Sequence, residues 1–534
     1  MTERLQFPER FRGKRGLVMG LGVFGGGTES VKFLAAYCSS LVVTDLRGPD
    51  VLRRSIDELQ GLPVEYRLGE HREEDFRNAD VVIHSPAVRP DNRYLQLARE
   101  SGAEVTMEMS LFIEACPART VGVTGSNGKT TTALLAYEML CEVMQRAQPE
   151  LEGRWADTAK AQASLPGKVW LGGNCGEPLI NRLPEITADD VVVLELSSFQ
   201  LQDWHRIRRS CAISLVTNIT ANHLDWHKDM AEYAWAKSAI YRYLPNERAM
   251  FFDGPGVNDL VSERTSAGST AWLVTENDIS CHARRGTAGD VADSPALITS
   301  EGGKPVLCRI HQRSSVKAAD VPFAPGDLRL PGRFNWQNFL CALALVYAGL
   351  DQRLEPTLKT LGGARRFRGV EHRLEFCGVV NGARCFNDSI ATTPESTIAA
   401  LSAFPDHPLV LILGGSDKGL SYDDLADAIF AHRHLQMVLV QGPNAGAIKR
   451  SCSAAWMRKY GTSGGLDAHD RPRVGIVGSF DEACEIAFET VKASWVILMS
   501  PASASFYEYA PNTRFTNFEH RGRHFKALVE AHET

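Results

Sequence analysis

The residues of this chain with the clearest chemistry form the segment T-G-S-N-G-K-T-T, residues 124–131. An apolar run, Val121-Gly122-Val123, precedes the segment, and a helix-compatible run from Ala133 to Leu140 follows it. A strand, a Gly-rich turn, Lys-Thr and a helix together are the context of a phosphate-binding loop, in which backbone N–H groups and the helix N-terminus attract phosphate. We therefore predict that a nucleoside triphosphate binds to seven loop residues: Gly125, Ser126, Asn127, Gly128, Lys129, Thr130 and Thr131.

Two side chains of this loop have distinct expected tasks. Lys129 is placed to reach the β- and γ-phosphates, and Thr130 is placed to offer its hydroxyl to Mg²⁺. The strict loop pattern has glycine at position 123, where this chain has Val123, so the loop is a variant. The alternative is an ordinary strand–turn–helix connection, which we disfavour because the turn, the Lys-Thr pair and both flanks agree.

Three further polar residues follow or lie near buried elements. Glu195 ends the apolar run 191–194, at the edge of a sheet where α/β proteins bind ligands, and a carboxylate there can hold Mg²⁺. His223 follows a second apolar run that ends at Val216, and Lys237 lies on an expected helix. Taken alone, Glu195 could be a surface residue, His223 a structural histidine and Lys237 a solvated lysine.

The elements that must position these groups fall into three α/β blocks. The first block opens with G-L-G-V-F-G at residues 20–25, followed by a helix-like segment and the apolar run 40–45, which ends in Asp45. This βαβ start with G-x-G-x-x-G and a later acidic residue indicates either a nucleotide-type phosphate site or a tight turn. The second block begins near residue 116, contains the phosphate loop and closes with an amphipathic helix over 334–350.

The third block carries fully apolar runs at 408–413, 437–440, 474–477 and 495–499. Continuous apolar runs separated by helices are typical of parallel strands that are buried on both faces. Two regions in the second block, 146–167 and 254–319, lack a strong periodic pattern, and we expect them to decorate the surface. The predicted fold is three α/β domains: a Rossmann-like domain over 1–115, a central phosphate-loop domain with a parallel sheet over 116–364, and a second Rossmann-like domain over 365–534.

Composition limits the classes of function. A length of 534 residues exceeds one hydrophobic core, and a net charge of −6 gives no general electrostatic reason to bind nucleic acid or an anionic membrane. The twelve cysteines form no C-x-x-C pair, which favours reduced thiols over a disulfide framework. The N-terminus has no apolar signal segment, and no stretch approaches the roughly 20 apolar residues of a membrane span. We expect a cytoplasmic, monomeric protein.

The loop and the segments after it resemble the Mur ligases, which join amino acids to the peptidoglycan precursor at the cost of ATP. The matching segments appear in order: L-E-L-S-S-F-Q-L at 194–201, T-N-I-T-A-N-H-L-D at 217–225, Lys237, 335–338, His372-Arg373, Asn387-Asp388-Ser389 and Ser500-Pro501-Ala502. The S-S-F-Q element points to the glutamate-adding members. The resemblance implies an enzyme that uses ATP and Mg²⁺ to add D-glutamate to UDP-N-acetylmuramoyl-L-alanine, through an acyl phosphate and a tetrahedral intermediate.

The resemblance also assigns roles to residues along the chain. The catalytic residues are Lys129, Glu195, His223 and Lys237, and the metal ligands are Thr130, Glu195, His223 and Lys237, the last as a carbamate formed with CO₂. The nucleotide contacts, besides the loop, are Asn338, Arg373 and Asp388. The contacts of the UDP-linked substrate are Val23, Phe24, Asp45, Arg47, Ser85, Asn174, Ser197 and Gln200. The contacts of the incoming glutamate are Thr392, Lys418, Ser505 and Phe518.

Two departures from the pattern concern the glutamate end. Where many D-glutamate ligases have lysine after Asn-Asp-Ser, this chain has Ile390, so one cation is missing. Residues 509–515 resemble an insertion, and Arg514 within it could replace the lost charge. An L-glutamate-adding variant is therefore an alternative. Two others are a folylpolyglutamate synthase, which would lack the N-terminal block, and a nucleotide-binding regulatory protein, which would not need the four catalytic residues.

Overall fold

The computed structural model describes residues 7–23, 25–146, 167–224, 226–243, 248–254, 256–266, 271–275, 295–299, 305–311, 314–351, 354–417, 419–461, 472–510 and 513–533. The chain forms two compact units. The first contains residues 1–324 and 337–364, and the second contains 325–336 and 365–534. Residues 325–336, which fall inside the predicted central range, thus group with the second unit.

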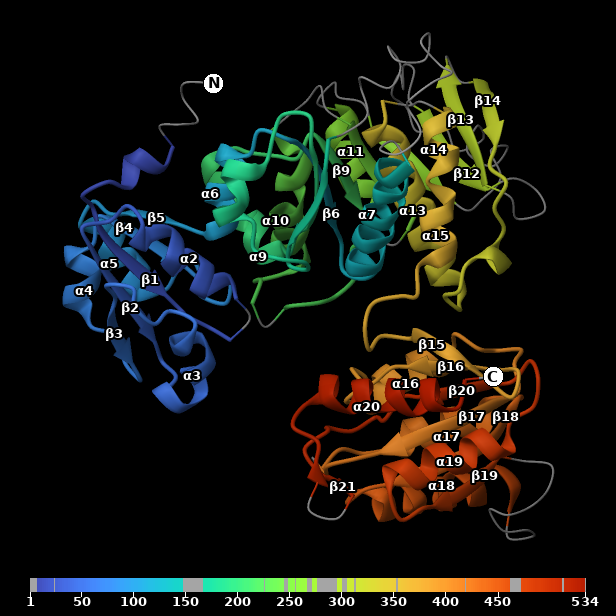
Figure 1. Ribbon diagram of the computed structural model, residues 1–534. Coiled ribbons are helices and arrows are strands. Elements are labelled where there is room, and N and C mark those ends of the chain that lie inside the picture. Colours follow the sequence, from blue (N-terminus) through green and yellow to red (C-terminus); the bar gives the residue numbers. More distant parts are fainter. Residues whose placement is uncertain are drawn as a thin grey trace. The chain divides into compact units, whose positions relative to one another are not determined.

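The first sheet is a parallel five-stranded sheet in the order β3-β2-β1-β4-β5 (Figure 1). Strands β2 and β3 are added on one side of β1, and β4 and β5 on the other side, so the strand order reverses between β1 and β4. Open α/β sheets bind ligands at such a point. The strands are β1 (Arg15–Met19), β2 (Ser40–Asp45), β3 (Glu65–Leu68), β4 (Val81–His84) and β5 (Glu104–Thr106). The helical segments are η1 (Pro8–Phe11), α2 (Gly26–Ala35), α3 (Pro49–Asp57), α4 (Glu73–Asn78) and α5 (Arg93–Glu100).

The second sheet of the first unit has the order β14-β13-β12-β11-β10-β9-β6-β8-β7, parallel except at β12-β13-β14. Its strands are β6 (Arg119–Thr124), β7 (Val169–Gly173), β8 (Val191–Glu195), β9 (Ile213–Val216), β10 (Arg248–Phe252), β11 (Ala271–Thr275), β12 (Pro295–Thr299), β13 (Pro305–His311) and β14 (Ser314–Asp320). The helical segments are α6 (Glu108–Ala115), α7 (Lys129–Arg146), η2 (Ile180–Glu185), α9 (Ser198–Ile207), α10 (Met230–Arg242), α11 (Asn258–Ser266), α13 (Arg333–Gly349), α14 (Leu354–Lys359) and α15 (Leu361–Arg366). The short helix η3 (Pro325–Asp327), the start of α13 and the end of α15 belong to the second unit.

The expectation that residues 254–319 decorate the surface is wrong. They supply α11 and the strands β11–β14, which extend the central sheet by four strands. The second half of β13, C-R-I-H, does alternate apolar and polar residues, as antiparallel strands near a sheet edge do. The many Gly, Ser, Thr and charged residues around it obscured this pattern. The other predicted surface region, 146–167, lies outside the described residues apart from its two ends.

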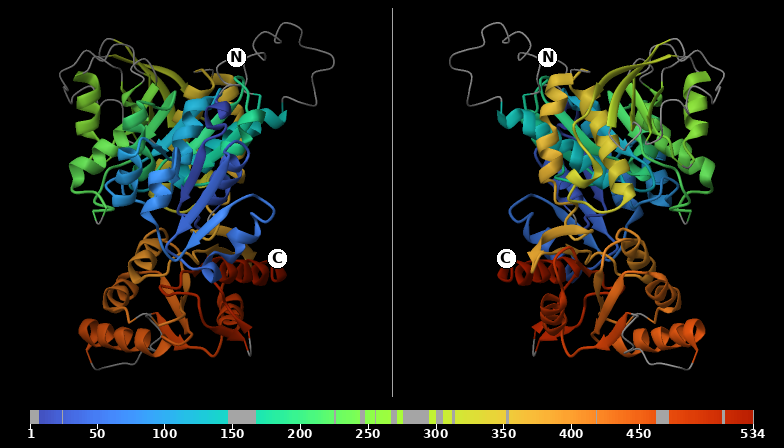
Figure 2. Two further views of the ribbon diagram at one scale, coloured as in Figure 1. Left: turned by 90° about the vertical axis from the view of Figure 1, so that its left-hand side faces the viewer. Right: turned by 90° about the vertical axis from the view of Figure 1, so that its right-hand side faces the viewer.

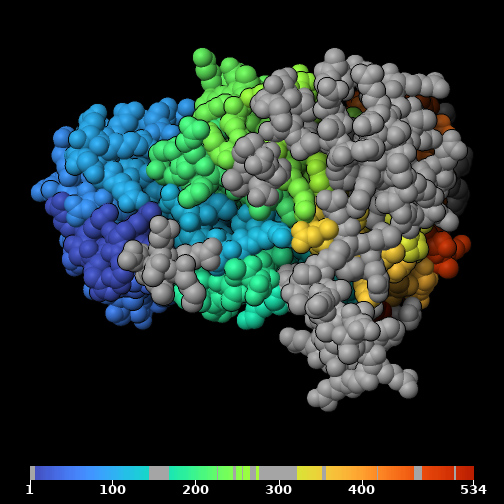
Figure 3. Space-filling model, turned by 90° about the horizontal axis from the view of Figure 1, so that it is seen from above, coloured from blue at the N-terminus to red at the C-terminus, as the bar shows by residue number. Residues whose placement is uncertain are grey.

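The two sheets of the first unit are connected by direct contacts. Arg89 Nη1 donates a hydrogen bond to the carbonyl of Trp226 at 2.7 Å, and Arg206 Nη2, on α9, donates one to Thr106 Oγ1, at the end of β5, at 3.2 Å. Figure 3 shows the corresponding surfaces, blue for the N-terminal part and cyan to green for the central part, meeting without a gap.

The second unit, drawn mostly in orange to red in Figure 2, contains a six-stranded sheet in the order β15-β16-β20-β17-β18-β19, in which only β15 and β16 are antiparallel. Its strands are β15 (Glu375–Val380), β16 (Ala383–Asn387), β17 (Leu409–Gly414), β18 (Leu435–Gln441), β19 (Arg473–Ile476) and β20 (Val496–Met499), so the four predicted strands are confirmed. The helices are α16 (Pro394–Leu401), α17 (Asp423–Ala431), α18 (Ala445–Tyr460), α19 (Phe480–Thr490) and α20 (Phe518–Ala531). Helices α16–α18 pack on one face, and α19 and α20 on the other.

The predicted insertion at 509–515 forms most of a short two-stranded hairpin, β21 (Glu508–Ala510) with β22 (Thr513–Arg514). The α/β fold class is confirmed. Among the described residues, none of the helices is both long and apolar enough to span a bilayer.

Candidate active site

The phosphate loop connects the end of β6 to the start of α7, as the sequence predicts. Gly125 and Gly128 have φ angles of 145° and 82°, which glycine adopts more readily than other residues. The loop is braced by the segment after β9. Ser126 Oγ donates a hydrogen bond to the carbonyl of Thr220 at 2.9 Å, and the backbone N–H of Asn127 donates one to Asn218 Oδ1 at 3.0 Å. These contacts fix the loop in one conformation before any ligand binds.

Replacing Gly128 by alanine is expected to weaken ATP binding at least tenfold and to lower stability by about 1–3 kcal/mol. The added Cβ would lie 2.4 Å from Asn338 Oδ1, at a backbone angle that disfavours any side chain. Isothermal titration calorimetry with ATP and thermal unfolding measure the two effects. Gly26→Ala is the matched control, because Gly26 also lies at a helix start and a Cβ there would meet nothing within 4 Å. Equal behaviour of the two variants would contradict the prediction.

Lys129 is the first residue of α7, and its Nζ donates a hydrogen bond to the carbonyl of Ser126 at 3.0 Å. The ammonium group therefore lies over the loop at the positive end of the helix. Asn338, on α13, accepts a hydrogen bond from Thr132 Oγ1 at 3.4 Å, so its side chain packs beside the start of α7. The structure thus brings together the loop, Lys129 and Asn338 from segments far apart in the sequence.

Glu195 lies at the end of β8, beside the strand that leads into the loop, and only 1% of its surface is exposed. Its Oε1 accepts a hydrogen bond from Asn174 Nδ2 at 3.1 Å. Its Oε2 is buried and has no hydrogen-bond partner among the described residues. A buried carboxylate oxygen without a donor is costly unless a cation or another ligand satisfies it.

Lys237, on α10, is also 1% exposed. Its Nζ donates hydrogen bonds to Thr124 Oγ1 at 3.3 Å and to the carbonyl of Gly125 at 3.0 Å, directly behind the phosphate loop. Burial and the nearby Lys129 charge hold the pKa of Lys237 well below its usual range, against the opposing effect of Glu195. The reading of Lys237 as a solvated helical lysine is therefore wrong.

His223 is exposed on the loop after β9 and has a φ angle of 55°. Its ring lies 4.9 Å from that of Phe199 and 6.5 Å from that of Tyr233, whose hydroxyl is hydrogen-bonded to Ser126 Oγ at 3.1 Å. The motifs did not single out His227, four positions later, which is buried and hydrogen-bonded to Ser198 Oγ at 2.9 Å.

Three residues that are predicted to contact the UDP-linked substrate form one cluster at the ends of β1, β2 and β4. Asp45 accepts hydrogen bonds from Arg47 Nε at 3.0 Å and Arg47 Nη2 at 2.9 Å, and from the N–H of Gly22 at 3.1 Å. Arg47 and these backbone bonds lower the pKa of Asp45, although burial opposes them. Ser85 packs closely against Gly20, because a Cβ added to Gly20 would lie 2.8 Å from the Cβ of Ser85. Val23 is exposed, and Phe24 lies outside the described residues.

Ser197 and Gln200, also predicted to contact substrate, form a capping box at the start of α9. Gln200 N donates to Ser197 Oγ at 3.2 Å, and Ser197 N donates to Gln200 Oε1 at 3.0 Å. The two side chains thus satisfy the free N–H groups of the helix end.

The predicted residues of the second unit gather where β16 and β20 end. Asp388 is 4% exposed and accepts hydrogen bonds from Ser500 Oγ at 2.7 Å and from Leu374 N at 3.2 Å. Arg373 is exposed, Thr392 and Phe518 are half-buried, and Ser505 is buried. Lys418 lies outside the described residues. Arg514 donates a hydrogen bond to the carbonyl of Phe506 at 2.8 Å and is exposed.

The stability difference between wild type and Asp388→Asn is expected to depend on pH. Burial raises the pKa of Asp388 to about 7, although the bonds from Ser500 and Leu374 and the charge of Arg373 oppose this. An unfolded aspartate has a pKa of about 3.9, so the folded chain holds the extra proton between about pH 4 and 7, and stability falls as pH rises through this range. Urea unfolding at pH 5 and pH 8 should show Asp388→Asn gaining up to about 3 kcal/mol on wild type as the pH rises between these two values. The exposed Asp406→Asn should show no such gain; a gain in both variants would contradict the assignment.

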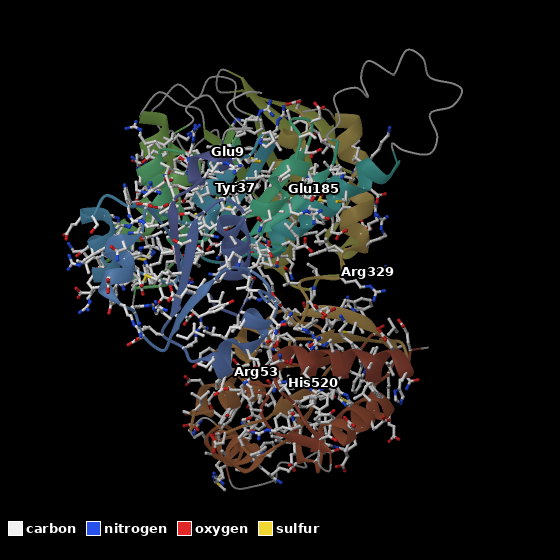
Figure 4. All side chains as sticks on the ribbon, turned by 60° about the vertical axis from the view of Figure 1, so that its left-hand side comes forward. Glu9, Tyr37, Arg53, Glu185, Arg329 and His520 are labelled. Carbon is white, nitrogen blue, oxygen red and sulfur yellow. The ribbon has the colours of Figure 1, made fainter. Side chains whose placement is uncertain are left out.

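A cavity of about 520 Å³ lies elsewhere in the first unit, where η1, the end of α2 and η2 meet; Glu9 and Tyr37 are labelled in Figure 4. Its lining is mostly apolar and contains no predicted site residue: Phe7, Pro8, Glu9, Phe33, Tyr37, Ala115, Pro117, Ile180, Asn181, Leu183, Pro184, Ile186, Thr187 and Ala188. The cavity is therefore separate from the predicted site residues.

Comparison with known proteins agrees with the fold. The Mur ligase middle domain family matches residues 123–346, and the Mur ligase MurD-like N-terminal domain family matches residues 14–107. A solved structure of UDP-N-acetylmuramoyl-L-alanyl-D-glutamate--2,6-diaminopimelate ligase covers 98% of this chain and 93% of its own, with a TM-score of 0.52 at 16% identity, and so supports the fold alone. The chain belongs to the Mur ligase family.

Curated relatives of similar length indicate which members of the Mur ligase family this chain resembles. The UDP-N-acetylmuramoylalanine--D-glutamate ligase of Roseiflexus sp. (strain RS-1) is 37% identical over 530 residues, which cover 97% of this chain and 99% of the relative. The protein of the same name from Acetivibrio thermocellus is 33% identical over 533 residues, covering 100% and 99%. The family resemblance deduced from the motifs is thereby confirmed.

Proposed function

We propose that this protein is an ATP-dependent ligase that joins D-glutamate to UDP-N-acetylmuramoyl-L-alanine and releases ADP and phosphate. The observation that carries the proposal is the 37% identity, over nearly the full length of both chains, to a relative of that name. The geometry beside the phosphate loop supports it, because Glu195 is buried there and one of its carboxylate oxygens has no hydrogen-bond partner among the described residues, as suits a ligand of a cation.

The chemistry requires activation of a carboxylate. A carboxylate oxygen of the UDP-linked substrate attacks the γ-phosphorus of ATP, ADP leaves, and an acyl phosphate remains. The amine of glutamate then attacks the acyl carbon, and the tetrahedral intermediate loses phosphate and a proton to give the amide. Phosphoryl transfer is mainly positioning and charge neutralisation, which the loop N–H groups, the start of α7 and Lys129 supply.

Mg²⁺ fits the same region. Among the described residues, no three His, Cys, Asp or Glu side chains gather closely enough to hold a metal by themselves. The unsatisfied Oε2 of Glu195 nevertheless offers one ligand, and Thr130, His223 and a carbamate on Lys237 would supply others. A bound Mg²⁺ would neutralise charge on the transferred phosphoryl group. Carbamylation replaces the ammonium of Lys237 with an anion, which suits a metal ligand.

The remaining roles belong to the same proposal. Asp45, Arg47, Ser85 and Val23 would hold the UDP group at the ends of β1, β2 and β4, where loops of α/β sheets bind ligands. Asn338, Arg373 and Asp388 would contact ATP, and Thr392, Lys418, Ser505 and Phe518 would contact glutamate. Because ATP is the energy source, we place the enzyme in the cytoplasm; its monomeric state stays a prediction.

The test is ADP release by the purified protein with UDP-N-acetylmuramoyl-L-alanine, comparing D-glutamate with L-glutamate. Turnover with D-glutamate alone is the expected result. Turnover with L-glutamate alone would replace the proposed stereochemistry, and the isoleucine at position 390 would then be its first candidate cause. No turnover with either would leave a folate-type ligase or a regulatory protein; the N-terminal sheet argues against the former, because a two-domain enzyme lacks it.

A further inference from the structure

Arg521, on α20, is fully buried, with 0% of its surface exposed (Figure 4 labels the preceding residue, His520). Its guanidinium donates four hydrogen bonds. The acceptors are Ser389 Oγ at 3.0 Å, the Ser389 carbonyl at 2.9 Å, the Ser503 carbonyl at 3.1 Å and the Ala504 carbonyl at 3.3 Å. All four are neutral oxygens. Within the described part of the chain, no carboxylate is paired with this charge.

A buried cation of this kind is expensive. Taking a charge out of water costs several kcal/mol even after the protein relaxes, and neutral acceptors recover only part of it. Burial lowers the pKa of Arg521 to about 10, so the group is still charged at neutral pH. An apolar side chain of similar volume often serves packing equally well. Packing alone therefore gives no reason for an arginine at this position.

The guanidinium joins the segments that carry the proposed glutamate contacts. Ser389 lies three residues before Thr392, and Ala504 lies directly before Ser505. Phe518 lies one helical turn before Arg521 on α20, and its carbonyl accepts a hydrogen bond from Ser389 Oγ at 2.8 Å. Three separate stretches of the chain thus meet at one fork of donors.

A fourth segment, the Gly-rich turn after β17, is fixed to the same place. Ser416 N donates a hydrogen bond to the Ala504 carbonyl at 2.9 Å. Gly415 packs so closely that a Cβ there would lie 2.3 Å from that carbonyl and 3.2 Å from Arg521 Nη1. The turn that leads to position 418 is therefore aligned by the loop that Arg521 holds.

We propose that Arg521 is the positioning residue of the glutamate site and that its unpaired charge favours a dicarboxylate amino acid there. The proposal rests on the proposed function. Charge in a low-dielectric interior acts over longer distances than in water, so the guanidinium stabilises a carboxylate held by the loops around it without touching it. It thereby supplies the positive charge that Ile390 does not. Arg514 is a poorer source, because it is exposed and hydrogen-bonded to Phe506 within its own segment.

The experiment measures Michaelis constants for D-glutamate, ATP and UDP-N-acetylmuramoyl-L-alanine in the full-length protein. For Arg521→Met we expect the KM for D-glutamate to rise at least 30-fold while the other two change less than threefold. Arg521→Lys, which keeps the charge and loses the fork, should give an intermediate value. Arg523→Gln removes an exposed arginine from the same helix and should change none of the three. Thermal unfolding reports whether each variant folds, and Arg521→Lys carries the test if the methionine variant does not.

The outcomes separate this inference from the function on which it rests. An unchanged KM for D-glutamate, or equal changes in all three constants, would overturn the role of Arg521. A rise in that KM with Arg514→Gln but not with Arg521→Met would assign the charge to the hairpin instead. Absence of D-glutamate-dependent ADP release in the wild type would remove the proposed function and this inference with it.

Discussion

Replacing Lys129 by alanine is expected to lower kcat for glutamate-dependent ADP release by about 10³-fold. The ammonium is the one cation that the structure places on the phosphate loop itself, hydrogen-bonded to the Ser126 carbonyl, within the described part of the site. In the alanine variant, the negative charge on the transferred phosphoryl group would no longer be neutralised by this nearby cation. The side chain is only half-buried, so the fold should survive the change.

A matched control for this variant is Lys168→Ala, which removes an exposed lysine before β7. Its kcat should stay within twofold of wild type. Thermal unfolding should show both variants folded, and calorimetry with ATP should show weakened binding for Lys129→Ala alone. If Lys129→Ala retained more than about a tenth of wild-type turnover, another group would have to neutralise the phosphates.

The variant Lys237→Ala is expected to lose about 10²- to 10³-fold in kcat and to recover part of it with formate or acetate. In the proposed carbamylation, the neutral amine of Lys237 would attack the carbon of CO₂; an N–C bond would form, one C–O π pair would move to oxygen and a proton would be released. The buried position behind the loop favours the uncharged amine that this reaction needs. A small carboxylate diffusing into the space left by alanine would restore an anion at the same place.

The control for Lys237→Ala is Lys228→Ala, an exposed lysine on the neighbouring loop, which should show neither loss nor rescue. Wild-type turnover should also fall in CO₂-depleted buffer and return on adding bicarbonate. Turnover of Lys237→Ala at the wild-type rate would disprove the carbamate, as would a loss that no carboxylate rescues in a protein indifferent to CO₂.

Local sequence patterns predicted the elements whose structure depends on residues that are contiguous in the chain. The phosphate loop was recognisable because its glycines, Lys-Thr pair and flanking elements are contiguous. The strands of the second unit, such as β17 and β20, were recognisable because both faces are buried and the runs are wholly apolar. Strands β11–β14 were missed, because these short runs are separated by stretches rich in Gly, Ser, Thr and charged residues that obscure their pattern.

The contacts that support the candidate site could not be predicted from short stretches of the sequence. Asn218 and Tyr233 brace the phosphate loop, yet they lie about 90 and 107 positions away from it in the sequence. The burial of Lys237 depends on how α10 packs behind β6, which no pattern within α10 reveals. The unpaired charge of Arg521 became visible only when two loops of the second unit, at Ser389 and at Ser503, were placed around it.

The bracing of the phosphate loop by distant segments has a consequence for how the protein is made. The bonds of Ser126 to Thr220, of Lys237 to Gly125 and of Thr132 to Asn338 span 94, 112 and 206 positions. Contacts of such long range form late, because closing large loops costs entropy before the contacts stabilise the chain. A nascent chain on the ribosome therefore carries the complete loop sequence long before it can hold a nucleotide. Nucleotide capture would mark the moment when roughly the first two thirds of the polypeptide have emerged and folded.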